Sequence, residues 1–342
     1  MPNYKHLLHM TDKTGILQFS HLSSPDPSSG YTLDDNARAF MVAVYMEDGE
    51  PWAKIYIRNL HQAQQPDGSW SNLLVAGQYS SSQNSQDSIG RALLACSIGL
   101  QCPWPQIKET CEELLIHHLP ETVKFTSPRA IAYSLLALSG GGAAHLSDNR
   151  TLLLAQKLSD FLLGLYQAKH DRGWLWFEDY ITYCNAIIPQ ALLAAYQVGG
   201  DKKHLKVGRD SLNFLNNILF RDGYLNIIGN QGWYQKGGKV PLFDQQPVDA
   251  ASVAFACLQA YQVLGTREYF DLAKLACHWY RGRNIHNVHL VDSESGGCYD
   301  ALTPEGFNRN QGAEAVLSLL MSDMFTEGIL TPGIEEERSS SG

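Results

Sequence analysis

Six Ala/Leu-rich stretches recur along this chain at intervals of roughly fifty residues, which is the spacing of a repeat architecture. The stretch 250–257, Ala-Ala-Ser-Val-Ala-Phe-Ala-Cys, is small and apolar on nearly every side, and a helix of that kind is buried all round. More charged, amphipathic stretches lie between these segments. We therefore expect six buried inner helices, near 34–46, 87–100, 128–138, 185–198, 248–264 and 311–325.

The amphipathic stretches predict an outer layer of helices, near 51–64, 104–117, 150–167, 202–219 and 268–281, with the N-terminal segment 4–10 as the sixth. Because inner and outer stretches differ so much in character, closed concentric rings are favoured over a solenoid, whose helices would be more alike. The predicted fold is an all-α (α/α)6 toroid. It forms a single domain over 1–327, with short β-hairpins at 173–177 and 223–227 and a flexible polar tail at 328–342.

Composition excludes several functional classes. The 342 residues carry a net charge of -9, whereas a nucleic-acid partner needs a basic stripe. No apolar run is long enough to span a bilayer, and the N-terminus lacks an apolar signal segment. Seven cysteines without a CxxC pair favour a reduced, cytoplasmic setting. Because neither Cys/His ligand spacing nor a P-loop or GxGxxG opening occurs, we expect no metal and no cofactor.

Acidic residues open the first two predicted inner helices. Asp34 and Asp35 start the first helix, and Asp87 starts the second. Each has two interpretations. An Asp at a helix start accepts backbone N–H bonds and suits the helix dipole. The same position also places a carboxylate at the open end of a ring, where it is available to a ligand. Two adjacent Asp residues exceed what one cap needs, so at least one is a candidate for sugar binding or catalysis.

The segment 174–185 is the densest candidate region, with two carboxylates among five aromatic residues. Aromatic faces stack on sugar rings, and apolar surroundings raise the pKa of a carboxyl toward that of a general acid. An ordinary core cluster beneath a surface loop is the alternative. The candidates are Glu178 and Asp179 for catalysis, and Trp176, Tyr183, Asn185 and Gln190 for sugar binding.

Further polar loops precede the last two inner helices and follow the first outer one. Asp249 is a candidate catalytic carboxylate or a helix cap. Glu314 lies one turn inside the last inner helix, and because buried helices seldom carry an unpaired carboxylate, pairing with Arg38, Arg91 or Arg129 is expected. The remaining sugar-binding candidates are Trp70 of the Asp-Gly-Ser-Trp turn, Trp233, Gln245, Gln246, Asn308 and Arg309.

The repeated order of Gly-rich turn, aromatic residue, acidic residue and small-residue helix resembles the six-hairpin glycosidase-like superfamily of (α/α)6 toroids. The segment 31–39 is also similar to helical domains of bacterial sugar-metabolism and glycosyltransferase-associated proteins. The resemblance covers about residues 1–327. It implies a saccharide or glycan ligand and, as one option, a glycosyltransferase partner. It is architectural, and a fold does not by itself specify a function.

Two activities found on such toroids are disfavoured by the residues. The sugar 2-epimerases of this superfamily use His acid/base pairs, and no His falls at a predicted inner-helix start; His286 and His289 in a loop are the exceptions. The turn at 64–70 looks like the Gln…Gly-x-Trp turn of terpene cyclases. Their Asp-x-Asp-Asp motif, however, reads Thr-Leu-Asp-Asp at 32–35.

Paired carboxylates at the mouth of a ring favour a glycoside hydrolase, which needs one acid and one base or nucleophile. Glu178 is the expected acid because aromatic residues flank it, and Asp35 or Asp87 is the expected base. Two alternatives stay open. One is a non-catalytic glycan-binding partner of a glycosyltransferase system, and the other is a phosphorylase with Arg309 in a phosphate pocket.

Overall fold

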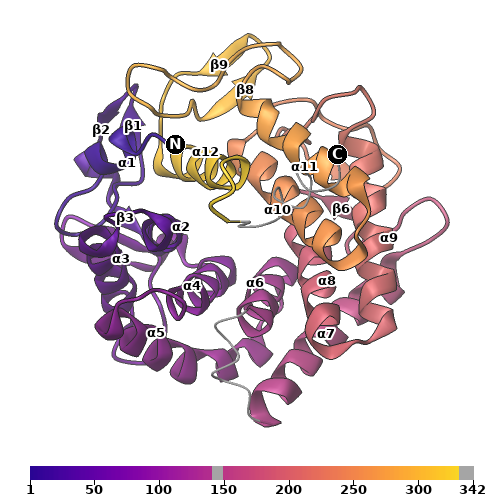
Figure 1. Ribbon diagram of the computed structural model, residues 1–342, viewed down its shortest axis with the longest axis horizontal. Helices are drawn as coiled ribbons and strands as arrows, with labels where there is room; N and C mark the ends of the chain where they lie inside the picture. The colour runs from indigo at the N-terminus through magenta and orange to yellow at the C-terminus, as the bar shows by residue number, and fades with distance from the viewer. Residues whose placement is uncertain (141–148, 331–342) are drawn as a thin grey trace, which may run out of the picture.

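Two concentric layers of helices form a ring (Figure 1). The computed structural model describes residues 1–140 and 149–330, and all element counts refer to these ranges. Six inner helices surround the central axis, as the sequence predicts. They are α2 (Leu33–Tyr45), α4 (Gln86–Gly99), α6 (Pro128–Ser139), α8 (Ile187–Gly199), α10 (Pro247–Leu264) and α12 (Ala313–Thr326).

The outer layer alternates with the inner one along the chain. Its short first helix, α1, packs against α12 and so supplies the sixth outer position from the N-terminus. The (α/α)6 toroid is therefore confirmed. The outer helices are α1 (Lys5–His9), α3 (Glu50–Gln62), α5 (Pro105–His118), α7 (Asn149–Lys169), α9 (Lys202–Leu219) and α11 (Arg267–Cys277).

The ring closes because its first and last inner helices touch. Helix α12 contacts both α10 and α2, whereas the ends of a solenoid would stay apart. Small residues allow the inner helices to approach closely. A Cβ on Gly90 of α4 would lie 2.7 Å from the carbonyl oxygen of Ala130 on α6. Glycine is therefore the residue that fits this crossing.

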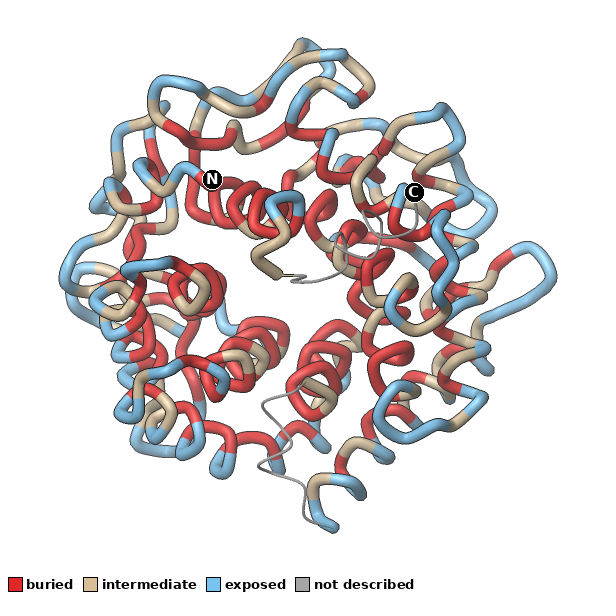
Figure 2. The backbone as a smooth tube through the Cα atoms, in the orientation of Figure 1, coloured by how far each residue is buried: buried red, intermediate tan, exposed pale blue. Residues whose placement is uncertain are grey.

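Burial separates the two layers (Figure 2). The inner helices are buried along most of their length, and Phe40 and Leu135 have no exposed surface. The outer helices bury one face only, as amphipathic helices do. All seven cysteines are buried and free. Within residues 1–140 and 149–330, no helix has both the length and the apolarity to cross a membrane.

Short strands lie in the loops, though not at the predicted positions. Segments 173–177 and 223–227 form no hairpin: Trp174 makes only an isolated antiparallel bridge with Asp171, and the side chains of Trp174, Trp176 and Leu225 are buried in the core. The strands are β1 (Ser20–His21), β2 (Ser24–Pro25), β3 (Tyr31–Thr32), β4 (Leu73–Val75), β5 (Gln78–Ser80), β6 (Tyr180–Ile181), β7 (Tyr234–Gln235), β8 (Ala301–Thr303) and β9 (Gly306–Asn308). They pair antiparallel as β1–β2, β3–β4–β5, β6–β7 and β8–β9.

The C-terminal end departs from the predicted boundary. Of the expected tail 328–342, residues 331–342 lie outside the described ranges. The first three residues pack on the ring: the backbone N–H groups of Ile329 and Leu330 donate to the Met324 carbonyl, at 2.9 and 3.3 Å. Residues 328–330 therefore continue the toroid rather than leaving it.

Candidate functional site

A polar cavity of about 380 Å³ lies at the end of the ring where the inner helices begin, and we name it the mouth cavity. Four carboxylates, four side-chain amides and one aromatic ring converge on it from distant parts of the chain. Phe19 is 52% exposed at its rim. The lining consists of Gln18, Phe19, Thr32, Asp34, Asp35, Asn72, Gln83, Gln246, Pro247, Asp300, Gly312, Glu314 and Ala315.

The residues that cap α2 and α4 show that the first-turn acids are not helix caps. Thr32 is the N-cap of α2 and Ser85 is the N-cap of α4, and each hydroxyl accepts a backbone N–H one turn into its helix. A Ser or Thr cap satisfies the donor that an Asp would otherwise accept. Asp34, Asp35 and Asp87 are therefore not the caps, and their carboxylates are directed to other partners.

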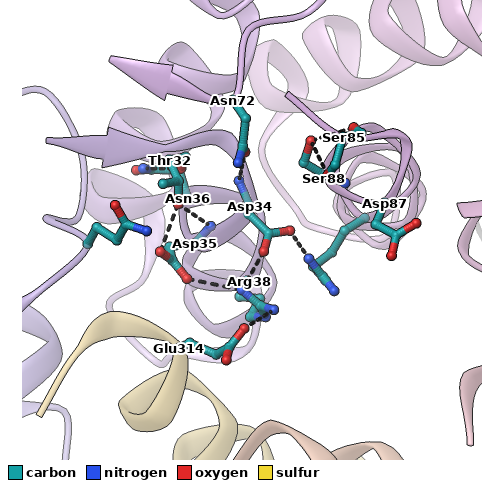
Figure 3. Close-up of polar contacts among 12 residues, drawn as sticks. Thr32, Asp34, Asp35, Asn36, Arg38, Asn72, Ser85, Asp87, Ser88 and Glu314 are labelled. Atoms are coloured by element: carbon teal, nitrogen blue, oxygen red, sulfur yellow. Dashed lines mark hydrogen bonds and ion pairs between the residues drawn. The ribbon is translucent and has the colours of Figure 1, made fainter. Parts of the chain in front are cut away.

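Charged side chains form a layer beneath the mouth cavity, drawn in Figure 3. Arg38 lies 3.1 Å from Asp34, 3.0 Å from Asp35 and 2.7 Å from Glu314. Arg91 forms a further ion pair with Asp34. We name these five residues the ion-pair layer. Three carboxylates face two guanidinium groups, so the layer holds no spare positive charge. The expected pairing of Glu314 with Arg38 is confirmed.

Asp300 and Glu314 face the mouth cavity in contrasting environments. Asp300 is half-buried and accepts a hydrogen bond of 2.6 Å from the Gly312 N–H. Burial, with a smaller contribution from the neighbouring Glu314 carboxylate, raises the pKa of Asp300 to about 6. The Glu314 side chain is 41% exposed and is held by Arg38. Two carboxyl groups whose surroundings differ in this way are suited to separate acid and base roles.

Burial also raises the pKa of two of the predicted catalytic carboxyls. The pKa of Asp35 rises to about 6, although Arg38 opposes the increase. The pKa of Asp249 rises to about 7, and the Cys184 N–H, which donates to it at 2.7 Å, limits the rise. Asp35 lines the mouth cavity. Asp249 does not, because its carboxylate is turned to the backbone of the loop before α8.

A second polar cluster joins the starts of α4 and α6 to the loop before α8, and we name it the Arg129 cluster. Asp87 accepts hydrogen bonds from Tyr183 at 2.6 Å and from Ser127 at 2.5 Å. Arg129 lies 3.1 Å from Glu178 and donates to the Tyr183 carbonyl at 2.6 Å. The predicted catalytic residues Asp87 and Glu178 are thus brought into one network. That network is separate from the carboxylates of the mouth cavity.

Aromatic candidates divide into exposed and buried ones. Tyr183 is 37% exposed, and its ring lies 6.2 Å from that of Trp233. Trp176 has no exposed surface and packs edge-on against Phe177, so the prediction that it stacks on a sugar is wrong. The same holds for Trp70, which is 3% exposed and donates its indole N–H to His118. A buried indole has no face to offer a ligand.

Several polar candidates are engaged elsewhere. Gln245 is fully buried, donating to Asn226 at 2.8 Å and accepting from Trp279 at 3.0 Å. Asn185 is 5% exposed and accepts hydrogen bonds from Arg129 and from a backbone N–H. Their donors and acceptors are used within the fold, so the predicted sugar-binding roles of Gln245 and Asn185 are wrong.

The remaining predicted residues lie in different places. Gln246 lines the mouth cavity, whereas Gln190 lies in a second cavity between the inner helices. Asp179 is exposed and forms an ion pair with Lys169 of the outer helix α7, so it is directed away from the mouth cavity. Asn308 and Arg309 are exposed at and beyond the end of β9, outside the lining of the mouth cavity.

Gln18 and Phe19 were not predicted from the sequence, and Asp300 was noted only as one carboxylate of the polar loop before the last inner helix. Glu314 was noticed only as an unusual buried-helix acid. Asp300 precedes the β8–β9 hairpin, thirteen residues before α12, and it reaches the cavity because the hairpin folds back on itself. Gln18 and Phe19 arrive from the N-terminal loop. A local sequence pattern does not indicate such long-range placement. Glu314 was indicated by one, because it is a carboxylate in an otherwise apolar helix.

Among the described residues, neither a histidine nor a metal-binding group of side chains is found at the mouth cavity. No histidine lines the mouth cavity within residues 1–140 and 149–330. His286 stacks on Phe243 at 5.0 Å and is hydrogen-bonded to the Thr303 carbonyl. The described residues contain no group of three or more His, Cys, Asp or Glu side chains arranged to hold a metal ion. The functional groups that line the mouth cavity are mainly carboxylates and amides.

Comparisons with known proteins extend the description of the fold. No protein-family model matches the chain, and neither does any curated protein. Among solved structures, a cellobiose 2-epimerase from Bacillus thermoamylovorans superposes with a TM-score of 0.73 at 11% identity, covering 95% of this chain and 96% of the epimerase. A D-mannose isomerase gives 0.67 at 16% identity, with 95% of each chain covered.

A glycoside hydrolase shares the fold as well. The GH76A α-1,6-mannanase of a Salegentibacter species superposes with a TM-score of 0.64 at 14% identity, covering 95% of this chain and 96% of the mannanase. Another structure of a mannanase of this kind contains α-1,6-mannotriose. At these identities the likeness establishes the (α/α)6 toroid, which both isomerising and hydrolysing enzymes use.

Proposed function

We propose that this protein is a carbohydrate-active enzyme that binds a saccharide in the mouth cavity and hydrolyses a glycosidic bond, with Asp300 as the acid and Glu314 as the base or nucleophile. One observation carries the proposal. Two carboxyl groups share one open cavity, and one is a half-buried acid with a pKa of about 6 while the other is partly exposed and paired with Arg38. Such a contrast is what general acid–base catalysis of glycosyl transfer requires.

The reaction follows from these roles. Protonated Asp300 donates its proton to the glycosidic oxygen as the bond from that oxygen to the anomeric carbon breaks. In an inverting reaction Glu314 accepts a proton from water, whose oxygen bonds to the anomeric carbon; in a retaining reaction Glu314 itself bonds to that carbon first. Carboxyl separations of about 6.5–9.5 Å accompany inversion and about 5–5.5 Å accompany retention. Either route adds one water across the bond.

The rest of the mouth cavity suits a polyhydroxylated ligand. Gln18 has a buried carbonyl oxygen without a hydrogen-bond partner, ready to accept from a sugar hydroxyl. Gln246 adds a second amide, and its side chain does not cap α10. Phe19 offers an exposed ring for stacking on a sugar face. The aromatic pair Tyr183 and Trp233 would contact a further sugar unit on the side of the Arg129 cluster.

Epimerisation or isomerisation of a sugar is the second candidate, and the two enzymes with the higher TM-scores above motivate it. An epimerase removes a proton beside a carbonyl and returns it, which also requires a paired acid and base. The lack of a histidine in the lining of the mouth cavity, among described residues, favours hydrolysis. The two reactions differ in their products, so one assay separates them.

The test is a screen of mono- and oligosaccharides by mass and by chromatography, with and without phosphate. Release of a shorter saccharide with uptake of water supports hydrolysis, a phosphorylated product indicates a phosphorylase, and an isomeric product of unchanged mass indicates an epimerase. Asp300→Asn and Glu314→Gln are each expected to lower turnover by about 10²-fold or more while the fold is kept. Asp179→Asn, on the outer surface, is the matched control and should retain turnover.

Two outcomes would replace the assignment. Wild-type turnover in both Asp300→Asn and Glu314→Gln would move the chemistry to the sequence-predicted acids, with Asp35, Asp87 and Glu178 tested next as amides. Saccharide binding without turnover of any substrate would make the protein a glycan-binding module, and the option of a glycosyltransferase partner would then be pursued.

A further inference from the structure

A second cavity, of about 320 Å³, lies between the inner helices, and we name it the lumen cavity. Its lining advances along the helices in steps of three and four residues, as in Arg38, Met41 and Tyr45 of α2. Side chains at this spacing share one face of a helix. Arg91, Leu94 and Ile98 repeat the pattern on α4, so the cavity runs along the axis of the ring.

The lumen cavity has a polar floor and apolar walls. Arg38, Arg91 and Tyr133 form the floor, with Arg91 donating to the Tyr133 hydroxyl at 2.8 Å. One turn further along, the walls are Met41, Leu94, Leu136, Phe255 and Met321. Leu258, Met324 and Leu330 extend them toward the ends of the inner helices. The walls offer apolar contact and the floor offers hydrogen bonds.

The ion-pair layer separates the lumen cavity from the mouth cavity. Arg38 and Arg91 line the lumen, while their partner Asp34 lines the mouth. A ligand in the lumen is therefore on the opposite side of this layer from a saccharide in the mouth. The lumen cavity is a distinct site, and nothing in the proposed reaction uses it.

Two polar atoms near the floor have no partner. The Gln190 carbonyl oxygen and the Ser252 hydroxyl are buried without a hydrogen bond in the described structure, and both residues line the lumen cavity. Buried polar atoms are normally hydrogen-bonded, and one left unpaired is unfavourable. A ligand whose head donates to Gln190 and bonds to Ser252 would satisfy both atoms.

The charge of the floor restricts that head. Arg38 and Arg91 already face Asp34, Asp35 and Glu314, so two positive groups meet three acidic ones. No positive charge is left to pair with an anionic head, and burying an unpaired charge is strongly unfavourable. The fitting head is uncharged and carries a hydrogen-bond donor.

Size restricts the rest of the ligand. From Arg38 to Tyr45 the wall rises roughly 10 Å, at about 1.5 Å per residue. A volume of about 320 Å³ holds roughly ten groups the size of a water molecule. We propose that the lumen cavity binds an unbranched aliphatic alcohol of about eight to ten carbons, with its hydroxyl at Gln190 and Ser252 and its chain along the apolar walls.

The methionines allow a direct test with 1-octanol as the probe. Met41, Met321 and Met324 line the lumen cavity, whereas Met1, Met10 and Met46 do not. In NMR spectra of the full-length protein with ¹³C-methyl methionine, 1-octanol should shift the three lumen signals saturably and leave the other three unchanged. Octanoate, of equal chain length but anionic, should bind at least about tenfold more weakly because the floor has no free cation.

Variants separate lumen binding from surface adsorption. Leu94→Trp fills the cavity and should abolish the shifts, while Leu152→Trp on the exposed face of α7 should not. Gln190→Leu should weaken 1-octanol binding about fivefold, the loss of one hydrogen bond, while Gln259→Leu at the rim should leave it unchanged. Should Leu94→Trp fail to fold, the wild-type pattern of methyl shifts decides alone.

Three results would overturn the inference. The first is the absence of saturable shifts at Met41, Met321 and Met324 up to the solubility of 1-octanol. The second is a response spread over all six methionines, which means surface adsorption. The third is octanoate binding as tightly as 1-octanol, which removes the argument from the charge of the floor.

Discussion

The mouth cavity and the lumen cavity are built from the same six helices yet differ in nearly every property. The mouth is lined by carboxylates and amides, and the lumen by Leu, Ile, Met and Phe side chains above a polar floor. The two are divided by the ion-pair layer, one to two turns into the inner helices. A repeat architecture thus produces two unlike sites because the first turns face the loops, while later turns face one another.

Removing the dividing layer is expected to have the largest effect. Arg38 is 3% exposed and compensates Asp34, Asp35 and Glu314. Arg38→Met leaves these acids without their main cation, so we expect a loss of about 3–5 kcal/mol in the free energy of unfolding, measured in urea. Arg267→Met, which removes an exposed pair with Asp271, should cost no more than about 1 kcal/mol. If Arg38→Met lost no more stability than Arg267→Met, the ion-pair layer would not be important for stability.

A carboxyl behind the mouth is expected to make stability depend on pH. Asp249 has its pKa raised by burial from 3.8 to about 7. Well below pH 3.8 both the folded and the unfolded chain hold the proton. As the pH rises from 4 to 7 the unfolded chain loses it first, so Asp249 lowers the free energy of unfolding progressively, by up to about 4 kcal/mol.

Asp249→Asn removes that titration and keeps an acceptor for the Cys184 N–H. The variant should therefore gain stability relative to wild type between pH 4 and pH 7, which urea unfolding at several pH values measures. Asp179→Asn, at an exposed ion pair, should show no such trend. A constant difference between Asp249→Asn and wild type across this range would contradict the assignment.

The mouth carboxyls predict how turnover responds to pH, once a substrate is identified. Asp300 must be protonated to act as an acid, and burial sets its pKa at about 6. Because this is the pKa of the free protein, kcat/KM should fall by up to about tenfold per pH unit above that value, or roughly 50-fold between pH 6 and pH 8. Glu314→Gln removes a neighbouring charge that raises this pKa. As the pH is raised, the residual activity of this variant should therefore begin to fall at a lower pH than the activity of the wild type does. A flat profile up to pH 8 would exclude Asp300.

The smallest expected effect contrasts two phenylalanines. Phe19 is exposed at the mouth, so Phe19→Ala should weaken saccharide binding by about 1 kcal/mol and leave the free energy of unfolding unchanged. Phe255 lines the lumen, and Phe255→Ala should lower stability by about 1–3 kcal/mol without affecting the saccharide. Calorimetry and urea unfolding of both variants provide the measurements. Saccharide binding weakened equally by both changes would show that the two cavities are not independent.

The placement of particular residues shows how far local patterns predict the site. Asp34, Asp35 and Gln246 were expected at the mouth and line it, because residues at the start of an inner helix are carried there by the helix itself. Trp176 and Tyr183 belong to one aromatic stretch, yet one is fully buried and the other is 37% exposed. Which aromatic residue faces solvent depends on packing partners from other helices, and the stretch does not contain that information.

The alternation of small-residue and amphipathic stretches by itself determined the (α/α)6 ring. The pattern of apolar residues in each helix determines whether that helix is buried on all sides or on one side only. Thr32, Ser85 and Ser127 cap the first three inner helices, a local signal in the sequence, whereas α8, α10 and α12 have no side-chain cap. Only the tertiary structure brought Asp300, Gln18 and Phe19 to the first-turn carboxylates, and only the closed ring enclosed the lumen. Both depend on contacts between residues far apart in the chain, which the folding of loops and the closure of α12 onto α2 decide.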